Sequence, residues 1–563
     1  MRILFLCHAF NSLTQRLYVE LTQDGHDISV EFDIHDAVSE EAVALWQPDL
    51  IVAPFLKRAI PESIWQNHAC LVVHPGIRGD RGPSALDWAI MNGESEWGVT
   101  VLQAGAEMDG GDIWAEAYFP MRPAKKSSLY RNEVTEAALQ AVRAALAKFA
   151  AGGYTPQPLD YADPQMRGRL RPAMRQHDRA IHWAKDNSAE VLRKIRAADG
   201  FPGVLDEMLG VPAYLYDAHP EPELRGTAGE IIARRGGAVC RATSDGAVWI
   251  GHLKLKSDGE PAFKLPATLA LAGRLGGIPE LPNPQGKDGE IAYEEKNGVG
   301  YLSFDFYNGA MNSERCERLR LAVEEALRRD TRVLVLLGGA DFWSNGLDLN
   351  LIEVADSPAD ESWRNINAMN DLARALLNAD EKVTVAALRG NAGAGGVFLA
   401  LAADQVWARE GVVLNPHYKA MGNLYGSEYW TYSLPRRVGA EHAGRITENR
   451  LPLTAGQAHE LALIDAAFGS SQETFRRDLE ARAEALAHAP DYPARLAAKR
   501  ERRTGDEAEK PLAAYRAAEL EHMTLNFYGF DPSYHVARYN FVHKVPHSHT
   551  PRHLARHRSP GKR

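Results

Sequence analysis

A histidine, an arginine and an aspartate lie close together in the first fifth of the chain, in a pattern that suits acid–base chemistry. His74 ends the apolar run LVVH, the pair Arg81-Gly82 follows it, and Asp109 lies in the turn MDGGD. An imidazole at the end of a strand can polarise or protonate a tetrahedral oxyanion, and a nearby carboxylate fixes its tautomer and raises its pKa. A single histidine in this position is more often structural, but the three residues together favour catalysis.

The elements that must position these residues alternate between strand and helix patterns over residues 1 to about 150. Short runs rich in β-branched residues lie at 3–7, 28–32, 50–53, 71–74 and 99–102, and helical patterns at about 12–24, 38–46 and 84–92 separate several of them. This alternation predicts a parallel, doubly wound α/β sheet, whose ligands bind beyond the carboxyl ends of the strands.

The remaining chain divides by its patterns into three further parts. Short strand patterns broken by glycine and proline extend from about 166 to 275 and predict a small β-barrel. After a Pro/Gly-rich linker at 279–290, a second α/β pattern carries the loops FWSNGLDL (342–349) and GNAGAGG (390–396). The rest is mainly helical and charged. We therefore expect an α/β multidomain protein with parts at 1–165, 166–275, 285–470 and 471–563.

Composition excludes several classes of protein. Hydrophobic residues at 45% and charged residues at 25% are ordinary for a globular chain and argue against disorder, collagen or a coiled coil. The 64 basic and 74 acidic side chains give a net charge of −10, which makes no case for nucleic-acid binding. No apolar run approaches about 18 residues, the length of a membrane span. With four separate cysteines and no CxxC pair, the chain is predicted to be a soluble cytoplasmic enzyme.

The last twenty or so residues form a basic tail that is rich in histidine. Its histidines are His543, His547, His549, His553 and His557. Histidines at such spacing could bind a metal ion, but a flexible, solvated tail is the favoured interpretation. We predict no metal site.

The stretches 71–93 and 97–119 resemble the folate-dependent formyltransferases of the methionyl-tRNA formyltransferase type. In that family a strand ends in Asn-x-His-Pro/Gly, an Arg-Gly pair follows, and an Asp-x-Gly-Asp turn comes later. The matching positions here are His74, Arg81-Gly82 and Asp109. The resemblance continues to about residue 265 and implies that His74 and Asp109 catalyse transfer of formyl from N10-formyltetrahydrofolate.

One position departs from the family's pattern, because Val72 stands where the family has asparagine. An oxyanion donor is therefore missing from its usual place. The polar loop at 11–15 could supply a replacement, or Ser12 could cap the following helix, and the sequence leaves both open.

The resemblance also implies which residues contact the folate. Backbone groups of the segment 54–61 should hold the pterin. The residues expected at this site are Ser12, Gln15, Phe55, Leu56, Lys57 and Arg81.

Residues of about 290–470 resemble the enoyl-CoA hydratase/isomerase (crotonase) family, on the two loops 342–349 and 390–396. In that family one backbone N–H from each loop forms an oxyanion hole for an acyl-CoA thioester, and the resemblance assigns these to Asn345 and Gly395. Glycine suits the second position, because the backbone must approach the carbonyl while it opens a helix. Coenzyme A is the implied ligand.

The carboxylates that hydratases of this family use are absent. Phe398 occupies the first position, and the second falls near Asn415-Pro416-His417. A formyltransferase-like domain in the same chain suggests that the thioester carries a formyl group. Such a thioester, formyl-CoA, has no α-carbon, so it can undergo neither hydration nor isomerisation. Tyr418 and Glu428, in the loop that follows, are the predicted acid–base pair, with His417 in reserve.

The order of the two domains resembles the hydrogenase maturation factors. That resemblance implies formyl transfer from N10-formyltetrahydrofolate to coenzyme A, followed by decarbonylation of formyl-CoA to carbon monoxide, an iron ligand in [NiFe]-hydrogenase. It also implies small-molecule substrates and, as a protein partner, the hydrogenase large subunit or its iron-ligand assembly factors. Two alternatives stay open: a formyltransferase with a non-catalytic crotonase-like assembly domain, and a formyl-CoA hydrolase.

Overall fold

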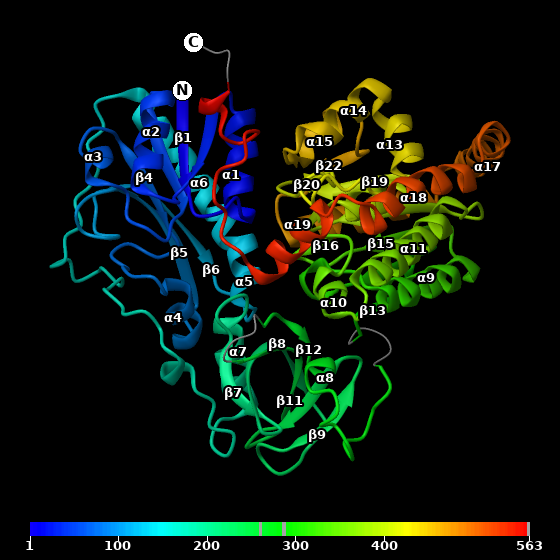
Figure 1. Ribbon diagram of the computed structural model, residues 1–563, viewed down its shortest axis with the longest axis horizontal. Coiled ribbons are helices and arrows are strands. Elements are labelled where there is room, and N and C mark those ends of the chain that lie inside the picture. The colour runs from blue at the N-terminus through cyan, green and yellow to red at the C-terminus, as the bar shows by residue number, and fades with distance from the viewer. Residues whose placement is uncertain (258–261, 284–288, 560–563) are drawn as a thin grey trace. The chain divides into compact units, whose positions relative to one another are not determined.

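The computed structural model describes residues 1–257, 262–283 and 289–559. The chain forms two compact units (Figure 1). The first contains Met1–Pro282 together with Pro546–Arg563, and the second contains Asn283–Val545. Part of the expected linker, 284–288, lies outside the described residues.

The first unit begins with a six-stranded sheet in the order β2-β1-β3-β4-β5-β6. Its strands are β1 (Arg2–Cys7), β2 (Asp27–Phe32), β3 (Leu50–Phe55), β4 (Cys70–His74), β5 (Glu96–Gln103) and β6 (Ile113–Pro120). Its longer helices are α1 (Ser12–Gln23), α2 (Asp36–Trp46), α4 (Ala85–Asn92) and α6 (Thr135–Ala151). Strands β1, β3 and β4 are nearly continuous apolar runs because both faces of the sheet are covered.

The expected all-parallel sheet is corrected at one edge. Strands β2, β1, β3 and β4 run parallel, but β5 and β6 are antiparallel to their neighbours. The short helix α4 ends at Gly93 in a left-handed conformation, and the chain then returns along β4 as β5. The loop between β5 and β6 carries Asp109.

The rest of the first unit contains helix α7 (Ser188–Ala198) and a second, antiparallel sheet. Its order is β7-β8-β11-β10-β9, with β12 paired to β11. The strands are β7 (Val204–Met208), β8 (Val211–Glu221), β9 (Ile231–Arg235), β10 (Ala238–Ala242), β11 (Ala247–Leu255) and β12 (Leu265–Pro266). Buried side chains of α7 and these strands form one apolar core. The short strands predicted between about 166 and 275 are therefore present, and they pair antiparallel.

The second unit contains a six-stranded sheet in the order β13-β14-β15-β17-β19-β22 and a smaller sheet in the order β16-β18-β20-β21. The strands of the larger sheet are β13 (Ile291–Lys296), β14 (Val299–Phe304), β15 (Val333–Leu337), β17 (Val383–Leu388), β19 (Gln405–Arg409) and β22 (Ala466–Phe468). Those of the smaller one are β16 (Phe342–Ser344), β18 (Asn391–Gly393), β20 (Val413–Asn415) and β21 (Leu453–Thr454). Strands β16 and β18 pair in parallel, which brings the two glycine-containing loops together.

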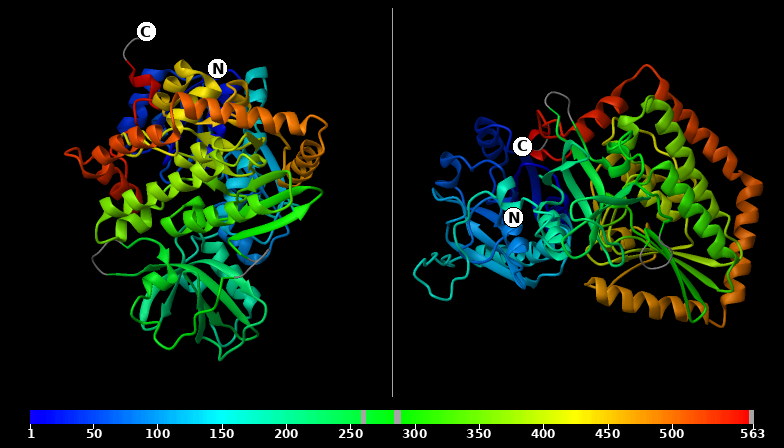
Figure 2. Two further views of the ribbon diagram at one scale, coloured as in Figure 1. Left: turned by 90° about the vertical axis from the view of Figure 1, so that its right-hand side faces the viewer. Right: turned by 90° about the horizontal axis from the view of Figure 1, so that it is seen from below.

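The helices of the second unit include several from the region after residue 470. They are α9 (Ser313–Arg328), α10 (Leu349–Val354), α11 (Pro358–Leu377), α12 (Gly395–Leu401), α13 (Trp430–Val438), α14 (Ala440–Asn449), α15 (Ala455–Glu460), α16 (Gln472–Ala487), α17 (Tyr492–Glu509), α18 (Leu512–Tyr528) and α19 (Ser533–His543). The orange helices α16–α18 run along the outside of this unit (Figure 2). Helix α18 packs against α11 and α13, so the helical extension belongs to the crotonase-like core. Among the described residues, no helix is both long and apolar enough to cross a bilayer.

The C-terminal tail differs from the flexible segment that its composition predicts. Residues of the tail between 547 and 558 contact the edge strand β2 of the first unit. The Val30 N–H donates to the Leu554 carbonyl at 3.0 Å, and the Phe32 N–H donates to the Thr550 hydroxyl at 2.7 Å. The tail thus covers a row of backbone groups that an edge strand would otherwise leave open. Within the described part of the chain, no three potential ligands come close enough to hold a metal ion.

A buried carboxylate, Glu31 of β2, anchors this tail. It accepts hydrogen bonds from Thr550, from His557 at 2.9 Å and from Arg558 at 2.9 Å. Burial opposes its charge, but the hydrogen bonds from His557, Thr550 and Arg558 outweigh burial and lower the pKa of Glu31 below its ordinary value. A carboxylate with a lowered folded-state pKa stabilises the fold above its ordinary pKa and loses that effect as the pH falls.

Replacing Glu31 with Gln should therefore release the tail. The amide keeps the shape but presents an N–H group to donors, and we expect the protection of the Val30 and Phe32 amides to fall by about 1–3 kcal/mol at neutral pH. Hydrogen exchange measures this directly, and the difference from wild type should shrink at acidic pH. The control is Glu41→Gln, since Glu41 is exposed and, among the described residues of the tail, bonds only Arg558. Equal exchange in wild type and Glu31→Gln would contradict this role.

Candidate functional site

The first site is built around His74, which is buried at the end of β4 between two carboxylates. Its Nε2 lies 3.1 Å from Oδ1 of Asp80, and its Nδ1 lies 3.5 Å from Oδ1 of Asp109. The predicted pairing of His74 with Asp109 is therefore present in the structure. Asp80 was not predicted, although it lies in the same RGDRG stretch as Arg81; its position in the motif was the signal available.

The charge balance at His74 favours the protonated imidazolium. Burial by itself lowers the pKa of the ring, but the hydrogen bonds and negative charges of Asp109 and Asp80 outweigh it and raise the pKa of His74 to about 9. The imidazolium in turn holds the pKa of Asp109 below its ordinary value against the effect of burial. At neutral pH this ring can therefore donate a proton or a charge-assisted hydrogen bond.

Local backbone geometry holds these groups in place. Asp109 adopts a positive φ of 55°, and its Oδ2 accepts a hydrogen bond from the Gly82 N–H at 3.1 Å. Gly76 has no side chain because a Cβ there would collide with the His74 ring. The Arg-Gly pair of the motif is thus explained in part: Gly82 positions the aspartate.

The other residues predicted for the first site are placed as follows. Phe55, Leu56 and Lys57 follow one another at the end of β3, where the Lys57 N–H donates to Asp33 at 3.3 Å. Arg81 pairs with Glu107 and lies 4.3 Å from the centre of the Tyr161 ring, so in this conformation its guanidinium is already engaged.

The loop after β1 shows which residue caps helix α1. Asn11 is the N-cap of α1, and its side chain accepts a hydrogen bond from the Thr14 N–H at 3.0 Å. Ser12 is the first helical residue and is not the cap. Gln15 donates to the Phe10 carbonyl at 2.9 Å. Val72 lies within β4, where its backbone pairs with Ala53 and Leu102.

The second site forms where β16 and β18 end side by side. Gly395 begins α12 at a helix N-terminus, where main-chain N–H groups lack helical acceptors. The assignment of Asn345 needs correction, because its N–H donates to the Gly309 carbonyl at 2.8 Å. Two residues on, the N–H of Leu347 has no hydrogen-bond partner within the described part of the chain. The N–H groups of Leu347 and Gly395 are therefore the better candidates for the oxyanion hole.

The predicted pair Tyr418 and Glu428 comes together directly beside Gly395. The Tyr418 hydroxyl donates to Oε2 of Glu428 and lies 3.0 Å from the Ser427 carbonyl. The other oxygen, Oε1, is buried and has no hydrogen-bond partner among the described residues. A Cβ on Gly395 would collide with this Oε1, so the unpaired oxygen lies against the N-terminus of α12.

Burial sets the proton affinity of this pair. Burial, opposed by the Tyr418 hydrogen bond and reinforced by the charge of Glu519, raises the pKa of Glu428 to about 7. Burial and the Glu428 charge raise the pKa of Tyr418 well above its ordinary value. A carboxyl group with a pKa near neutrality can both accept and return a proton under physiological conditions.

Phe398 occupies the position of the first hydratase carboxylate. Its ring stacks on Tyr418 with centroids 5.0 Å apart and an interplanar angle of 20°. The aromatic side chain thus orients the tyrosine at the position from which the family's carboxylate is missing. His417 is buried beside it, and its backbone N–H donates to the Asn415 carbonyl at 2.9 Å.

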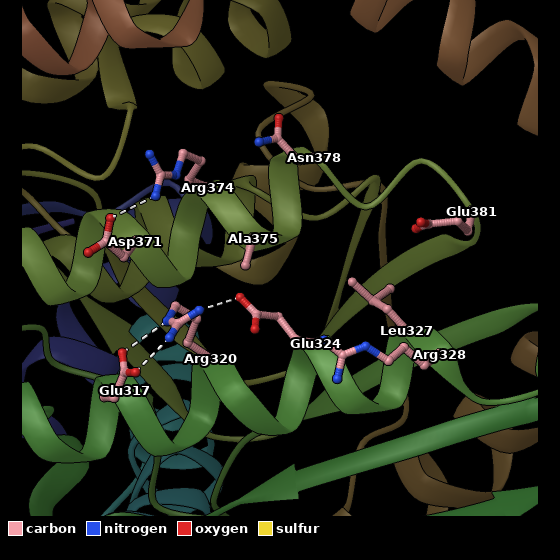
Figure 3. A pocket seen from close by; sticks show the side chains of 10 residues that line it. All are labelled: Glu317, Arg320, Glu324, Leu327, Arg328, Asp371, Arg374, Ala375, Asn378 and Glu381. Atoms are coloured by element: carbon pink, nitrogen blue, oxygen red, sulfur yellow. Dashed lines mark hydrogen bonds and ion pairs between the residues drawn. The ribbon is translucent and has the colours of Figure 1, made fainter.

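A surface hollow of the second unit, about 870 Å³, lies elsewhere, between α9 and α11 (Figure 3). Its arginines are engaged by neighbouring acids: Arg320 pairs with Glu317 and Glu324, and Arg374 pairs with Asp371. None of the predicted site residues lines it. We assign it no role in the chemistry.

Three family models match the chain in the order that the fold shows. They are formyl transferase at residues 1–146, formyl transferase C-terminal domain at 173–262, and enoyl-CoA hydratase/isomerase at 294–535. The fold and its two sites thus define a formyltransferase joined to a crotonase-type domain. Methionyl-tRNA formyltransferase of Geobacter sulfurreducens is 24% identical over 265 residues, covering 45% of this chain and 79% of that protein.

Two relatives match the whole chain. Hydrogenase maturation factor HoxX of Bradyrhizobium diazoefficiens is 55% identical over 558 residues, covering 99% of this chain and 97% of that protein. The crystal structure of HypX from Aquifex aeolicus in complex with tetrahydrofolic acid is 49% identical, with a TM-score of 0.96 and 99% of each chain covered. The chain belongs to this family of hydrogenase maturation factors, as the predicted resemblance implied.

The contact between Gly395 and Glu428 yields a test. A valine at position 395 must displace the Glu428 carboxyl and obstruct the backbone N–H, so turnover of a coenzyme A thioester at this site should fall by roughly 10²–10³. Turnover by the full-length protein and calorimetry with coenzyme A measure the effect. The control is Gly444→Val, at a helical glycine that has open space around it. Unchanged affinity and turnover in Gly395→Val would show that the thioester lies elsewhere.

Proposed function

We propose that the protein transfers formyl from N10-formyltetrahydrofolate to coenzyme A at the first site and splits formyl-CoA into carbon monoxide and coenzyme A at the second. The observation that carries the proposal is the unpaired Oε1 of Glu428 against Gly395, with Tyr418 bonded to the other oxygen. An acid–base pair beside two available main-chain donors suits a thioester substrate. The tetrahydrofolic acid in the HypX crystal structure supports folate as the donor.

At the first site, the thiol sulfur of coenzyme A attacks the formyl carbon, and a C–S bond forms. The positive charge of the protonated His74 stabilises the tetrahedral oxyanion, and Asp80 and Asp109 hold the ring in place. The C–N bond to the folate then breaks, and N10 takes up one proton while the thiol has lost one. The products are formyl-CoA and tetrahydrofolate.

At the second site, the formyl hydrogen of formyl-CoA leaves as a proton and the C–S bond breaks. Oε1 of Glu428 is the base for that proton, and the sulfur keeps the electron pair of the C–S bond. The departing thiolate is then protonated by Tyr418 or by the protonated Glu428. One proton moves from carbon to sulfur, no oxidant or reductant is consumed, and the products are carbon monoxide and coenzyme A.

The carbon monoxide would serve as an iron ligand for [NiFe]-hydrogenase. This part of the proposal rests on the name of the HoxX relative, hydrogenase maturation factor. The receiver would be the hydrogenase large subunit or an assembly factor for its iron ligands.

One experiment separates this proposal from its alternatives. The protein is supplied with formyl-tetrahydrofolate and coenzyme A without air, and a reduced haem protein traps carbon monoxide. The expected result is that the amount of carbon monoxide trapped equals the amount of tetrahydrofolate formed. Formate would identify a formyl-CoA hydrolase, and accumulation of formyl-CoA alone would identify a non-catalytic second domain.

His74→Ala and Asp109→Asn should each lower the rate of formyl-CoA formation by roughly 10²–10⁴, the scale of a general acid–base contribution. Cleavage of formyl-CoA that is added directly should continue, because the second site is intact. His177→Ala, which changes an exposed histidine of the same unit, is the control. Formation of formyl-CoA by His74→Ala at the wild-type rate would remove His74 from the mechanism.

Glu428→Gln and Tyr418→Phe should each still form formyl-CoA but release little carbon monoxide, with a loss of roughly 10²–10⁴ in that step. Because the pKa of Glu428 is about 7 and its carboxylate is the base, wild-type release should rise with pH through neutrality. The controls are the variants Glu441→Gln and Tyr539→Phe, which change exposed residues. If both site variants release carbon monoxide normally, His417 becomes the residue to test.

A further inference from the structure

Glu519, in the middle of α18, is a fully buried carboxylate that the proposed mechanism does not use. Its side chain is 0% exposed. Oε1 accepts from the N–H of Thr431 at 2.9 Å and from its hydroxyl at 2.6 Å. Oε2 accepts from the Tyr429 N–H at 3.0 Å and lies 3.0 Å from the Ser427 hydroxyl. All these donors belong to the turn that contains Glu428.

That turn has an unusual backbone conformation that needs outside support. Glu428 and Tyr429 have φ values of 58° and 60°, a region that residues with side chains rarely adopt. Tyr429 is the N-cap of α13 and makes no capping hydrogen bond with its side chain. Glu519 therefore acts as the cap from another helix, because it binds the free N–H groups at the start of α13.

Asn370 of α11 supports the same turn from the other side. Its Oδ1 accepts from the Glu428 N–H at 2.8 Å and lies 2.9 Å from the Ser427 hydroxyl, which donates its one hydrogen either to Asn370 or to Glu519. Ser427 thus links Asn370 and Glu519, and its own N–H donates to Oε2 of Glu428 at 3.2 Å. The backbone and the carboxyl of Glu428 are both fixed by this network.

The charges around Glu428 leave Glu519 as its strongest ionic neighbour. The titratable groups that interact with Glu428 are Tyr418, Glu519 and, from α9, the buried thiol of Cys316. Arg516, one turn before Glu519 on α18, pairs with Asp371 at 2.6 Å. The charge of Glu519 raises the pKa of Glu428, so its removal should lower that pKa.

We propose that Glu519 is a positioning residue of the second site, which fixes the turn that presents Glu428. The proposal rests on the proposed cleavage of formyl-CoA at this site. Glu519 does not face the substrate position, because its two oxygens are bonded to the turn. Its effect on the reaction passes through Glu428.

The test uses the full-length protein with formyl-CoA added directly, and carbon monoxide release is measured between pH 5 and 9. In Glu519→Gln, only the amide oxygen can accept hydrogen bonds, so the donors that bond to the other oxygen of Glu519 lose their acceptor. The glutamine side chain also carries no charge. We expect kcat to fall roughly 10- to 100-fold, the scale of a small misplacement of a catalytic group. The midpoint of the rising limb should also move to lower pH. A purely structural role would lower kcat without moving this midpoint.

Two further variants complete the test. Glu519→Asp keeps the charge but shortens the reach, so kcat should fall while the midpoint stays near that of wild type. Glu521→Gln removes an exposed carboxylate two residues along the same helix and should behave as wild type. Formyl-CoA formation at the first site should be unchanged in all three.

The outcomes distinguish this proposal from the function on which it rests. If wild type releases no carbon monoxide from formyl-CoA, the proposed function fails. If wild type releases it and Glu519→Gln keeps both its rate and its midpoint, Glu519 has no positioning role. A Glu519→Asp variant with wild-type kcat would overturn the proposal as well, whether or not Glu519→Gln folds.

Discussion

The close contact between the Glu428 carboxyl and the backbone of Gly395 constrains the whole second site. The carboxyl can lie there only because residue 395 has no side chain, and it is then removed from water, which raises its pKa. A buried carboxyl group with one unpaired oxygen costs free energy that the surrounding fold must supply. Hydrogen bonds from Tyr418 and Ser427 to the carboxyl group, and one from the Glu428 N–H to Asn370, hold Glu428 in this position.

The first site also buries an ionisable group, but there the surroundings favour the charged form. His74 is as buried as Glu428, but it lies between two carboxylates, so its cationic form is favoured. Burial strengthens each of these interactions because little water screens them. The two units thus hold buried ionisable groups of different kinds: an imidazolium between two carboxylates, and a carboxyl group that can take up a proton near neutral pH.

Much of this arrangement follows from local sequence, and the exceptions have physical causes. The proximity of Tyr418 and Glu428 was predictable because both lie in one loop. That of His74 and Asp109, which lie on different elements, was predictable from the family pattern that contains both. Asp80 could not be assigned, since spacing alone does not show that a carboxylate turns towards a ring nitrogen. Glu519 lies far along the chain from its turn and reaches it only through the packing of α18. Strand patterns likewise do not reveal direction, so the antiparallel β5 and β6 were missed, as was the Gly309 carbonyl that engages the Asn345 N–H.

The tail on β2 gives the chain an order of assembly. The first unit contains both Met1 and the last described residues, while the second unit is a continuous segment inserted before the tail. During synthesis from the N-terminus, β2 is made early, yet the residues that cover its edge emerge only after the entire second unit. Until then the nascent first unit exposes a strand edge that invites pairing with other chains. A chain that stops before residue 546 therefore lacks the segment that closes its first unit.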